Sequence, residues 1–233
     1  MDARSLRELE LLSVARLYGL EIGAAPAPSP QESAGVQVPS LNAFHPAASA
    51  SLEKLRTLVA DCRACGLCQQ RKQAVLGVGA ETGPWMFVGE GPGADEDEQG
   101  EPFVGQAGRL LDNMLAAIGC ARGRDTYIAN VVKCRPPGNR NPTPEESSAC
   151  APFLDRQIEL VAPRLIVALG RIAAMRLLGT EASIASLRGT VHRHKGIPVV
   201  VTYHPAYLLR SPPEKAKAWE DLLLARRTLA ALA

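Results

Sequence analysis

The chain has 233 residues, 46% of them hydrophobic, and a formal net charge of +2. This composition predicts a globular protein with a hydrophobic core. The sequence contains no apolar run of the ~20 residues that a membrane-spanning helix needs. The near-neutral charge argues against a protein that coats nucleic acid. It does not exclude a local basic face on the surface of the protein. Since the N-terminal residues do not resemble a secretory signal, we expect a cytoplasmic protein whose six cysteines are thiols or metal ligands.

The first segments predict an extension and a linker. Apolar positions recur at helical spacing over residues 5–20, so residues 1–22 are expected to form a helical extension. Residues 23–50 are rich in Ala, Pro and Ser, which predicts a linker. A helix on such a linker suits docking to a partner protein. The compact domain is expected over residues 51–233.

Strands and helices alternate through this domain. The strands are expected at 85–88, 126–132, 165–169 and 197–202, and the helices at 52–59, 107–118, 144–161, 171–178 and 214–231. Thr143 and Pro144 are the expected N-cap and first residue of the helix at 144–161. This alternation predicts an α/β fold, a three-layer αβα sandwich around a mostly parallel four-stranded sheet.

Polar residues follow the ends of the expected strands. Gly89 and Glu90, Asn130, Gly170 and His204 each lie at or near such an end. Because the carboxyl ends of parallel strands share one edge of a sheet, we expect these residues to converge there on a ligand. The loop Gly89-Glu-Gly-Pro-Gly93 adds glycines that permit positive φ or close approach to a ligand. Its alternative interpretation is a glycine-rich turn followed by a solvated acidic run.

The cysteines suggest a metal site. A C-x2-C pair is followed closely by a third cysteine, and two more come much later: Cys62, Cys65, Cys68, Cys134 and Cys150. Two close and two distant thiolates can hold zinc or an iron–sulfur cluster, and the spacing does not choose between them. A third ligand from Cys68 and unpaired structural thiols also remain open. Cys120 is interpreted as an incidental thiol.

Four motifs, with the cysteines, carry a resemblance to a known family. They are Gly89-Glu-Gly-Pro-Gly93, Gly100-Glu-Pro-Phe-Val-Gly105, Tyr127-Ile-Ala-Asn-Val-Val-Lys-Cys-Arg-Pro-Pro137 and His204-Pro-Ala-Tyr-Leu-Leu-Arg210. Together they resemble the family 4 uracil-DNA glycosylases, the iron–sulfur-containing branch of that superfamily. The likeness covers roughly residues 55–230, in order. It implies a [4Fe–4S] cluster, structural in role, held by Cys62, Cys65, Cys134 and Cys150. Cys68 falls where family members often have another residue.

The resemblance also implies how a flipped base is read. Phe103 matches the aromatic on which uracil stacks, and Asn130 matches the amide that pairs with the pyrimidine edge. Gly89 to Gly91 bring backbone close to the base. His204 matches the histidine that binds a uracil carbonyl and stabilises charge on the leaving base. Uracil is then the released product.

Further positions follow from the same motifs. Leu208 matches the wedge that fills the gap in the duplex, and Arg210 with basic residues of 188–195 could contact phosphates. The best-known branch of the superfamily has a water-positioning aspartate where this chain has Gly91. Glu90 is our first choice for that role. Asp95, Glu96 and Asp97 are the other candidates.

The implied function is excision of uracil from DNA by a monomeric, nucleoid-associated enzyme, leaving an abasic site. One alternative is a superfamily member trapped covalently on the abasic sugar through a histidine. The loop from Arg135 to Thr143 contains no histidine, which disfavours trapping. The other alternative is a non-catalytic iron–sulfur or zinc DNA-binding module. Such a module would not explain why Phe103, Asn130 and His204 occur together.

Overall fold

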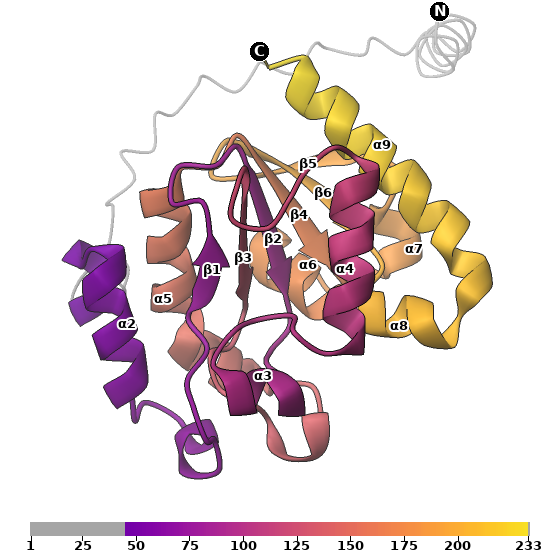
Figure 1. The fold of residues 1–233 in the computed structure, drawn as a ribbon. Helices are drawn as coiled ribbons and strands as arrows, with labels where there is room; N and C mark the ends of the chain where they lie inside the picture. Colours follow the sequence, from indigo (N-terminus) through magenta and orange to yellow (C-terminus); the bar gives the residue numbers. More distant parts are fainter. Residues whose placement is uncertain (1–44, 233) are drawn as a thin grey trace, which may run out of the picture. The chain divides into compact units, whose positions relative to one another are not determined.

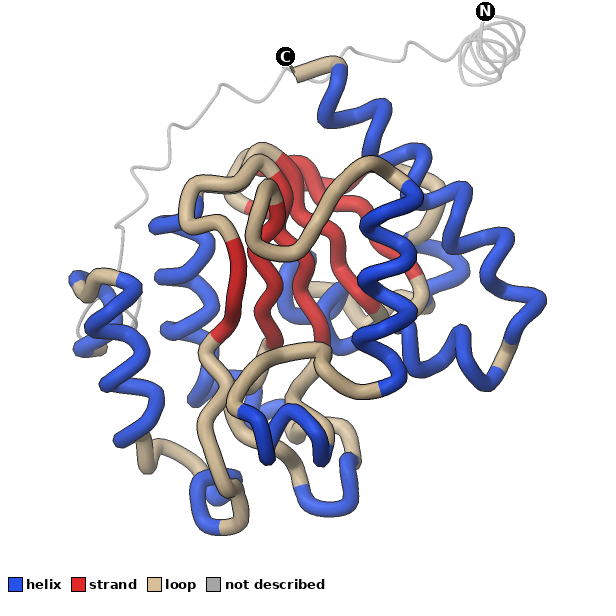
Figure 2. Tube along the Cα trace, viewed as in Figure 1, coloured by secondary structure: helices blue, strands red, loops and turns tan. Residues whose placement is uncertain are grey.

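The computed structural model describes residues 45–232, so the expected extension 1–22 and most of the linker 23–50 lie outside the described residues. Within the described part, a central sheet lies between two layers of helices (Figures 1 and 2). Its six strands have the order β1-β3-β2-β4-β6-β5. This arrangement confirms the expected three-layer α/β fold.

The elements are as follows. The strands are β1 (Gly77–Gly79), β2 (Trp85–Gly89), β3 (Thr126–Asn130), β4 (Leu165–Leu169), β5 (Val191–His194) and β6 (Ile197–Thr202). The α-helices are α2 (Leu52–Asp61), α3 (Ala94–Gln99), α4 (Gln106–Ala117), α5 (Pro144–Val161), α6 (Arg171–Leu178), α7 (Ile184–Leu187), α8 (Pro205–Arg210) and α9 (Lys215–Ala230). The 3-10 turns are η2 (Pro46–Ser49), η3 (Gly66–Gln69), η4 (Pro137–Asn139) and η5 (Pro212–Glu214).

The four central strands are those expected from the sequence, and all pair in parallel. β4 and β6 have the predicted bounds, and β2 runs one residue further than expected. β3 ends at Asn130, two residues earlier than predicted. Val131 and Val132 are fully buried, but they belong to the loop after the strand. Two adjacent apolar residues indicate that this segment is buried, and they do not show that it is a strand. For this reason the apolar pattern predicted a strand that is too long.

The sheet has six strands where four were expected, because each edge carries a short antiparallel strand. β1 is Gly-Val-Gly, too short to show an alternating pattern. β5 is Val-His-Arg-His, and its polar side chains suit the edge of a sheet. Because these residues belong to a basic segment, the sequence did not predict a strand there. β5 joins β6 through Lys195 and Gly196, both at positive φ (47° and 85°), as in a tight two-residue hairpin.

The two faces of the sheet bury different side chains. Met86 and Val88 of β2 belong to the core that includes residues of α2, α5 and α6. Trp85 and Phe87 of the same strand belong to the other core, with residues of α4 and α9. This alternation is the period-two pattern of a strand that is covered on both faces.

The helix at 144–161 begins as its sequence predicts. Thr143 Oγ1 accepts from the Glu146 amide at 3.2 Å, and the Glu146 carboxylate accepts from the Thr143 amide at 2.8 Å. Pro144 is the first helical residue. This reciprocal capping box holds the start of α5 beside the loop that follows β3.

Residues 46–50, which were expected to end the linker, pack against this domain. η2 contacts α5, and Ala47 and Ala50 are buried in the same core as α5. Arg156 of α5 donates from Nε to the carbonyl of Ala50 at 2.9 Å. The packed part of the described chain therefore begins a few residues before Ser51, the N-cap of α2.

Candidate active site

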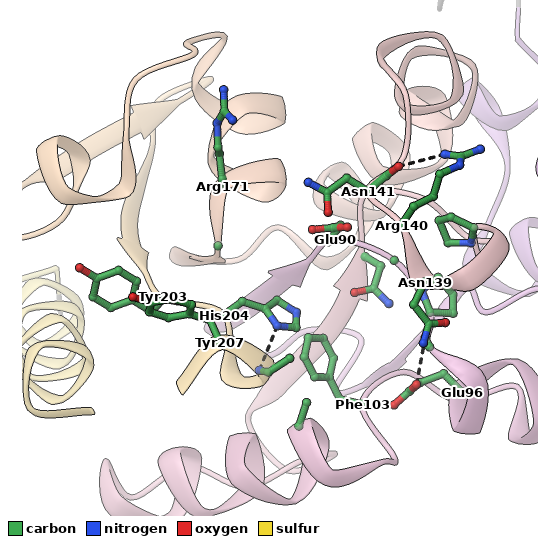
Figure 3. Close-up of a pocket in the computed structure, with 18 of the residues that line it drawn as sticks. Glu90, Glu96, Phe103, Asn139, Arg140, Asn141, Arg171, Tyr203, His204 and Tyr207 are labelled. Atoms are coloured by element: carbon green, nitrogen blue, oxygen red, sulfur yellow. Dashed lines mark hydrogen bonds between the residues drawn. The ribbon is translucent and has the colours of Figure 1, made fainter. Parts of the chain in front are cut away.

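The carboxyl ends of the four parallel strands surround one cleft of about 610 Å³ (Figure 3). The residues that the sequence placed at this edge, or that the resemblance added, line it together: Glu90, Gly91, Phe103, Asn130, Gly170, His204 and Arg210. They come from the loops after β2, β4 and β6, from the end of β3, from the segment between α3 and α4, and from α8. The expected convergence of distant segments at one sheet edge is what the structure shows.

Gly89 leaves the room in which Phe103 and Asn130 meet. A Cβ atom at Gly89 would lie 2.6 Å from Phe103 Cζ and would overlap Asn130 Oδ1. Asn130 is 2% exposed, and within residues 45–232 its Oδ1 has no hydrogen-bond partner. Buried acceptors in native proteins are nearly always satisfied. The amide oxygen is therefore available to a donor on a ligand that stacks beside Phe103.

Phe103 is held in a costly backbone conformation. Its φ is 57°, in the left-handed region that residues with a side chain rarely adopt. Arg122 donates to the carbonyls of Phe103 (2.7 Å) and Pro102 (2.8 Å) and pairs with Asp112 at 3.1 Å. Gly108 of α4 leaves space for the Phe103 carbonyl, which any Cβ there would overlap. No sequence motif indicated the role of Arg122.

His204 is a neutral hydrogen-bond donor in this setting. Its Nδ1 accepts from the Ala206 amide at 3.1 Å, so the proton of the neutral ring lies on Nε2. Burial, and to a smaller extent the positive charge of Arg210, lower the pKa of His204 to about 4. The ring lies 5.5 Å from the Phe103 ring, centre to centre. His204 can therefore donate from Nε2 to a base that rests on Phe103.

Glu96 supports the glycine-rich loop. Its carboxylate accepts from the amides of Gly93 (3.0 Å), Val104 (2.9 Å) and Gly105 (3.1 Å). Three such bonds tie the loop after β2 to the segment that carries Phe103. The bond from the Gly93 amide to Glu96 is the glutamate half of a capping box, since glycine has no side chain to supply the other half.

The remaining acids differ in what they can reach. Asp97 is 3% exposed and accepts from the amides of Lys72 (2.9 Å) and Gln73 (3.3 Å), so it is a structural residue. Asp95 is exposed on α3 and is not among the residues that line the cleft. Glu90 lines the cleft, and burial raises the pKa of its carboxyl above the usual value. Glu90 is thus the candidate best placed to hold a water.

The two residues expected to contact DNA, Arg210 and Leu208, differ in their exposure. Arg210 is exposed and lines the cleft. Leu208 is 1% exposed and packs among residues of α4 and α9, whereas its neighbours Tyr207 and Leu209 are 38% and 42% exposed. A wedge has to protrude from the surface, so Leu208 does not fit that expectation. The helical turn of α8 points the motif's first leucine inward, which the sequence did not indicate.

Much of the basic segment 188–195 is used within the fold. Arg188 forms an ion pair with Asp221 at 3.0 Å. His192 Nε2 lies 2.7 Å from the carbonyl of Leu187, and His194 is buried with its Nδ1 2.7 Å from the carbonyl of Leu177. These three side chains are therefore poorly placed for the phosphate contacts that were expected of them.

The cysteines gather around a second, small cavity. Cys62, Cys65, Cys68, Cys134 and Cys150 line it, together with Arg71 and Lys133. Arg71 Nη1 donates to Cys134 Sγ at 2.8 Å, and the Lys133 amide donates to Cys150 Sγ at 3.3 Å. Across residues 45–232, no group of three or more Cys, His, Asp or Glu has a metal-binding arrangement as it stands. Cys120 is buried in the other core.

Lys133 connects this cysteine cavity to the cleft. It is 1% exposed, and its Nζ donates to the Asn130 carbonyl at 2.7 Å and to Gln157 Oε1 at 2.5 Å. Gln157 Nε2 in turn lies 2.9 Å from the Tyr127 hydroxyl. A lysine beside two valines carried no signal of this network. The network fixes the end of β3, from which Asn130 reaches the cleft.

Known proteins are similar to this chain in sequence. Residues 76–223 match the Uracil DNA glycosylase superfamily. A type-4 uracil-DNA glycosylase of Pyrobaculum aerophilum is 45% identical over 181 residues, covering 74% of this chain and 92% of that protein. Those of Archaeoglobus fulgidus (46% over 170 residues; 70% and 85%) and Thermotoga maritima (48% over 162 residues; 69% and 84%) are also similar. The chain belongs to the uracil-DNA glycosylase superfamily, within its type-4 branch.

Proposed function

We infer that this protein removes uracil from DNA by hydrolysing the N-glycosidic bond of deoxyuridine, which leaves an abasic site. The observation that carries the inference is the meeting of Phe103, Asn130 and a neutral His204 around the bare backbone of Gly89. The type-4 relatives, which are named for this activity, support it.

The cleft can read a base that has left the stack. A glycosylase takes its target nucleotide out of the duplex and binds the base in a pocket. Uracil stacked on Phe103 gains ~1–3 kcal/mol, as base–aromatic stacking does elsewhere. The unpartnered Oδ1 of Asn130 accepts from uracil N3–H while the amide nitrogen donates to O4. Cytosine presents the reverse pattern on that edge and is disfavoured.

His204 and Glu90 divide the chemistry. As the glycosidic bond breaks, negative charge builds on the uracil carbonyl, and the Nε2–H of His204 donates to it from a fixed position. A preorganised donor of this kind contributes about 10²–10³ in rate. Glu90 orients the water that attacks the sugar, because Glu96 and Asp97 accept backbone amides instead. The departing base makes the sugar electrophilic, so the water needs orientation more than deprotonation.

We propose that Cys62, Cys65, Cys134 and Cys150 hold a [4Fe–4S] cluster. Their convergence on one cavity fits such a group, and the donors from Arg71 and Lys133 suit thiolate sulfurs. The cluster would pin the segment after α2 to the loop before α5, a structural role outside the hydrolysis. Cys68 lines the same cavity and is the competing ligand.

The other hypotheses are less favoured. The family and the cleft give no support to a covalently trapped protein or to a non-catalytic DNA-binding module. None of the described helices is long and apolar enough to cross a membrane. Monomeric state, nucleoid association and a partner for the N-terminal extension stay predictions.

The test is cleavage of a DNA oligonucleotide with one deoxyuridine, followed by alkali to break abasic sites. We expect wild type to act, and His204→Ala and Asn130→Ala each to lose about 100-fold or more. Trp219→Ala is the control, since this exposed residue lies outside the cleft. All variants should keep the visible absorption of the cluster. A wild-type protein that releases no uracil would contradict the proposed function.

A further inference from the structure

The cleft continues beyond Phe103 and Asn130 to a pair of tyrosine rings. Tyr203 precedes His204, Tyr207 lies in α8, and their ring centres are 5.2 Å apart with planes tilted by 30°. In Figure 3 the two rings lie side by side, on the side of His204 away from Phe103. Both line the same cleft as the base-reading residues. The tyrosine pair is therefore beside the base pocket and not within it.

The pair is held in place from within the fold. The guanidinium carbon of Arg188 lies 5.5 Å from the centre of the Tyr203 ring. Arg188 Nε donates to Asp221 Oδ2 at 3.0 Å, and Asp221 is 1% exposed. A cation fixed over the ring by a buried acid orders Tyr203 before any ligand arrives. Binding to a preorganised pair costs less conformational entropy than binding to mobile side chains.

Tyr207 is the open member of the pair, since 38% of it is exposed. Arg171 and Arg210, both exposed, line the same cleft and can contact backbone phosphates. A DNA strand that delivers one base to Phe103 leaves the neighbouring base at the mouth of the cleft. That neighbour has lost its stacking partner, so one of its faces is uncovered.

We propose that Tyr207, backed by Tyr203, stacks on the base next to the flipped deoxyuridine and forms a second base subsite. Stacking reads the face that all four bases share, so the subsite accepts any of them. This inference rests on the proposed glycosylase function and adds to it a contact outside the uracil pocket. It also supplies an exposed side chain where Leu208, at 1% exposure, offers none.

The experiment removes the neighbouring base from the substrate and the ring from the protein. Cluster-loaded full-length protein is given DNA oligonucleotides in which the nucleotide 5′ or 3′ of the deoxyuridine is a tetrahydrofuran abasic analogue. We expect wild-type kcat/KM to fall about 5- to 100-fold on one of the two substrates. Tyr207→Ala should lose a similar factor on the intact substrate and become indifferent to that base. Tyr207→Phe, which keeps the ring, should retain the dependence.

Leu209→Ala is the matched control, because Leu209 is exposed on the same helix but is not among the residues that line the cleft. It should respond to the missing base as wild type does. A second measurement places 2-aminopurine beside the deoxyuridine and follows the fluorescence of the 2-aminopurine on binding. Wild type should quench it, and Tyr207→Leu should quench it less.

The outcomes separate the two proposals. If wild type cleaves the deoxyuridine substrate equally well with and without each neighbouring base, the stacking subsite is wrong while the function stands. If Leu209→Ala and not Tyr207→Ala abolishes the dependence, the exposed leucine is the contact and the inference is overturned. If wild type releases no uracil from any substrate, the proposed function fails first and the subsite falls with it.

Discussion

A methyl group added at Gly89 should disable the enzyme without unfolding it. In Gly89→Ala the new Cβ would lie 2.6 Å from Phe103 Cζ and would overlap Asn130 Oδ1. Carbon atoms in contact normally lie ~3.5–4.0 Å apart, so the ring must move by about 1 Å. The amide must move as well. Both groups that we assign to uracil recognition are therefore displaced by a single methyl.

The magnitude follows from that displacement. A misplacement of about 1 Å near reacting groups costs about 10²-fold in rate, so kcat/KM on a uracil oligonucleotide should fall about 100-fold. Overpacking a core costs ~1–3 kcal/mol, which for a domain of this size lowers Tm by about 2–12 °C. The protein should thus stay folded at the assay temperature and keep the visible absorption of the cluster.

Gly179→Ala is the matched control. Gly179 ends α6 at a φ of 63° and has nothing within 4 Å of the position that a methyl group would take, so the substitution adds backbone strain without a clash. That strain costs ~1–2 kcal/mol, a stability loss comparable to that of Gly89→Ala. Single-turnover cleavage and thermal unfolding are measured for both variants. Full activity in Gly89→Ala, or an equal loss in Gly179→Ala, would refute the steric reasoning.

Three further results are expected. Because burial raises the pKa of Glu90, its inactive protonated form persists to higher pH than in an exposed glutamate. Initial rates of the wild type, measured over about pH 4.5–8, should therefore fall toward acidic pH. Glu90→Gln should not show this acidic decrease. Arg71→Lys, which cannot reproduce the fork to Cys134 Sγ and the nearby carbonyls, should lose the cluster about 10–100-fold more readily to a chelator, followed by its visible absorption. Arg122→Ala frees the left-handed Phe103, so kcat/KM should fall about 10-fold with cluster absorption unchanged.

Local signals in the sequence were enough for the framework. Runs of apolar residues bounded by glycine or polar residues located the four parallel strands, and a cap with proline located the start of α5. Because parallel strands end at one edge, the sequence also predicted that Glu90, Asn130 and His204 would meet. The two edge strands were not predicted, because a three-residue Gly-Val-Gly segment and a polar Val-His-Arg-His segment lack the apolar pattern of a buried strand.

What only the tertiary structure decided concerns burial and partners between distant residues. Leu208 and Leu209 are identical side chains in one motif, and only the packing of α8 buries one and exposes the other. Likewise, four acids followed the strand end. The sequence favoured Glu90, and only the structure showed that Glu96 and Asp97 are occupied by backbone amides. Arg122 and Lys133 support Phe103 and Asn130 from outside any motif. Composition and spacing are local properties of a chain. Whether a side-chain atom is exposed or lacks a hydrogen-bond partner depends on all the residues that fold around it.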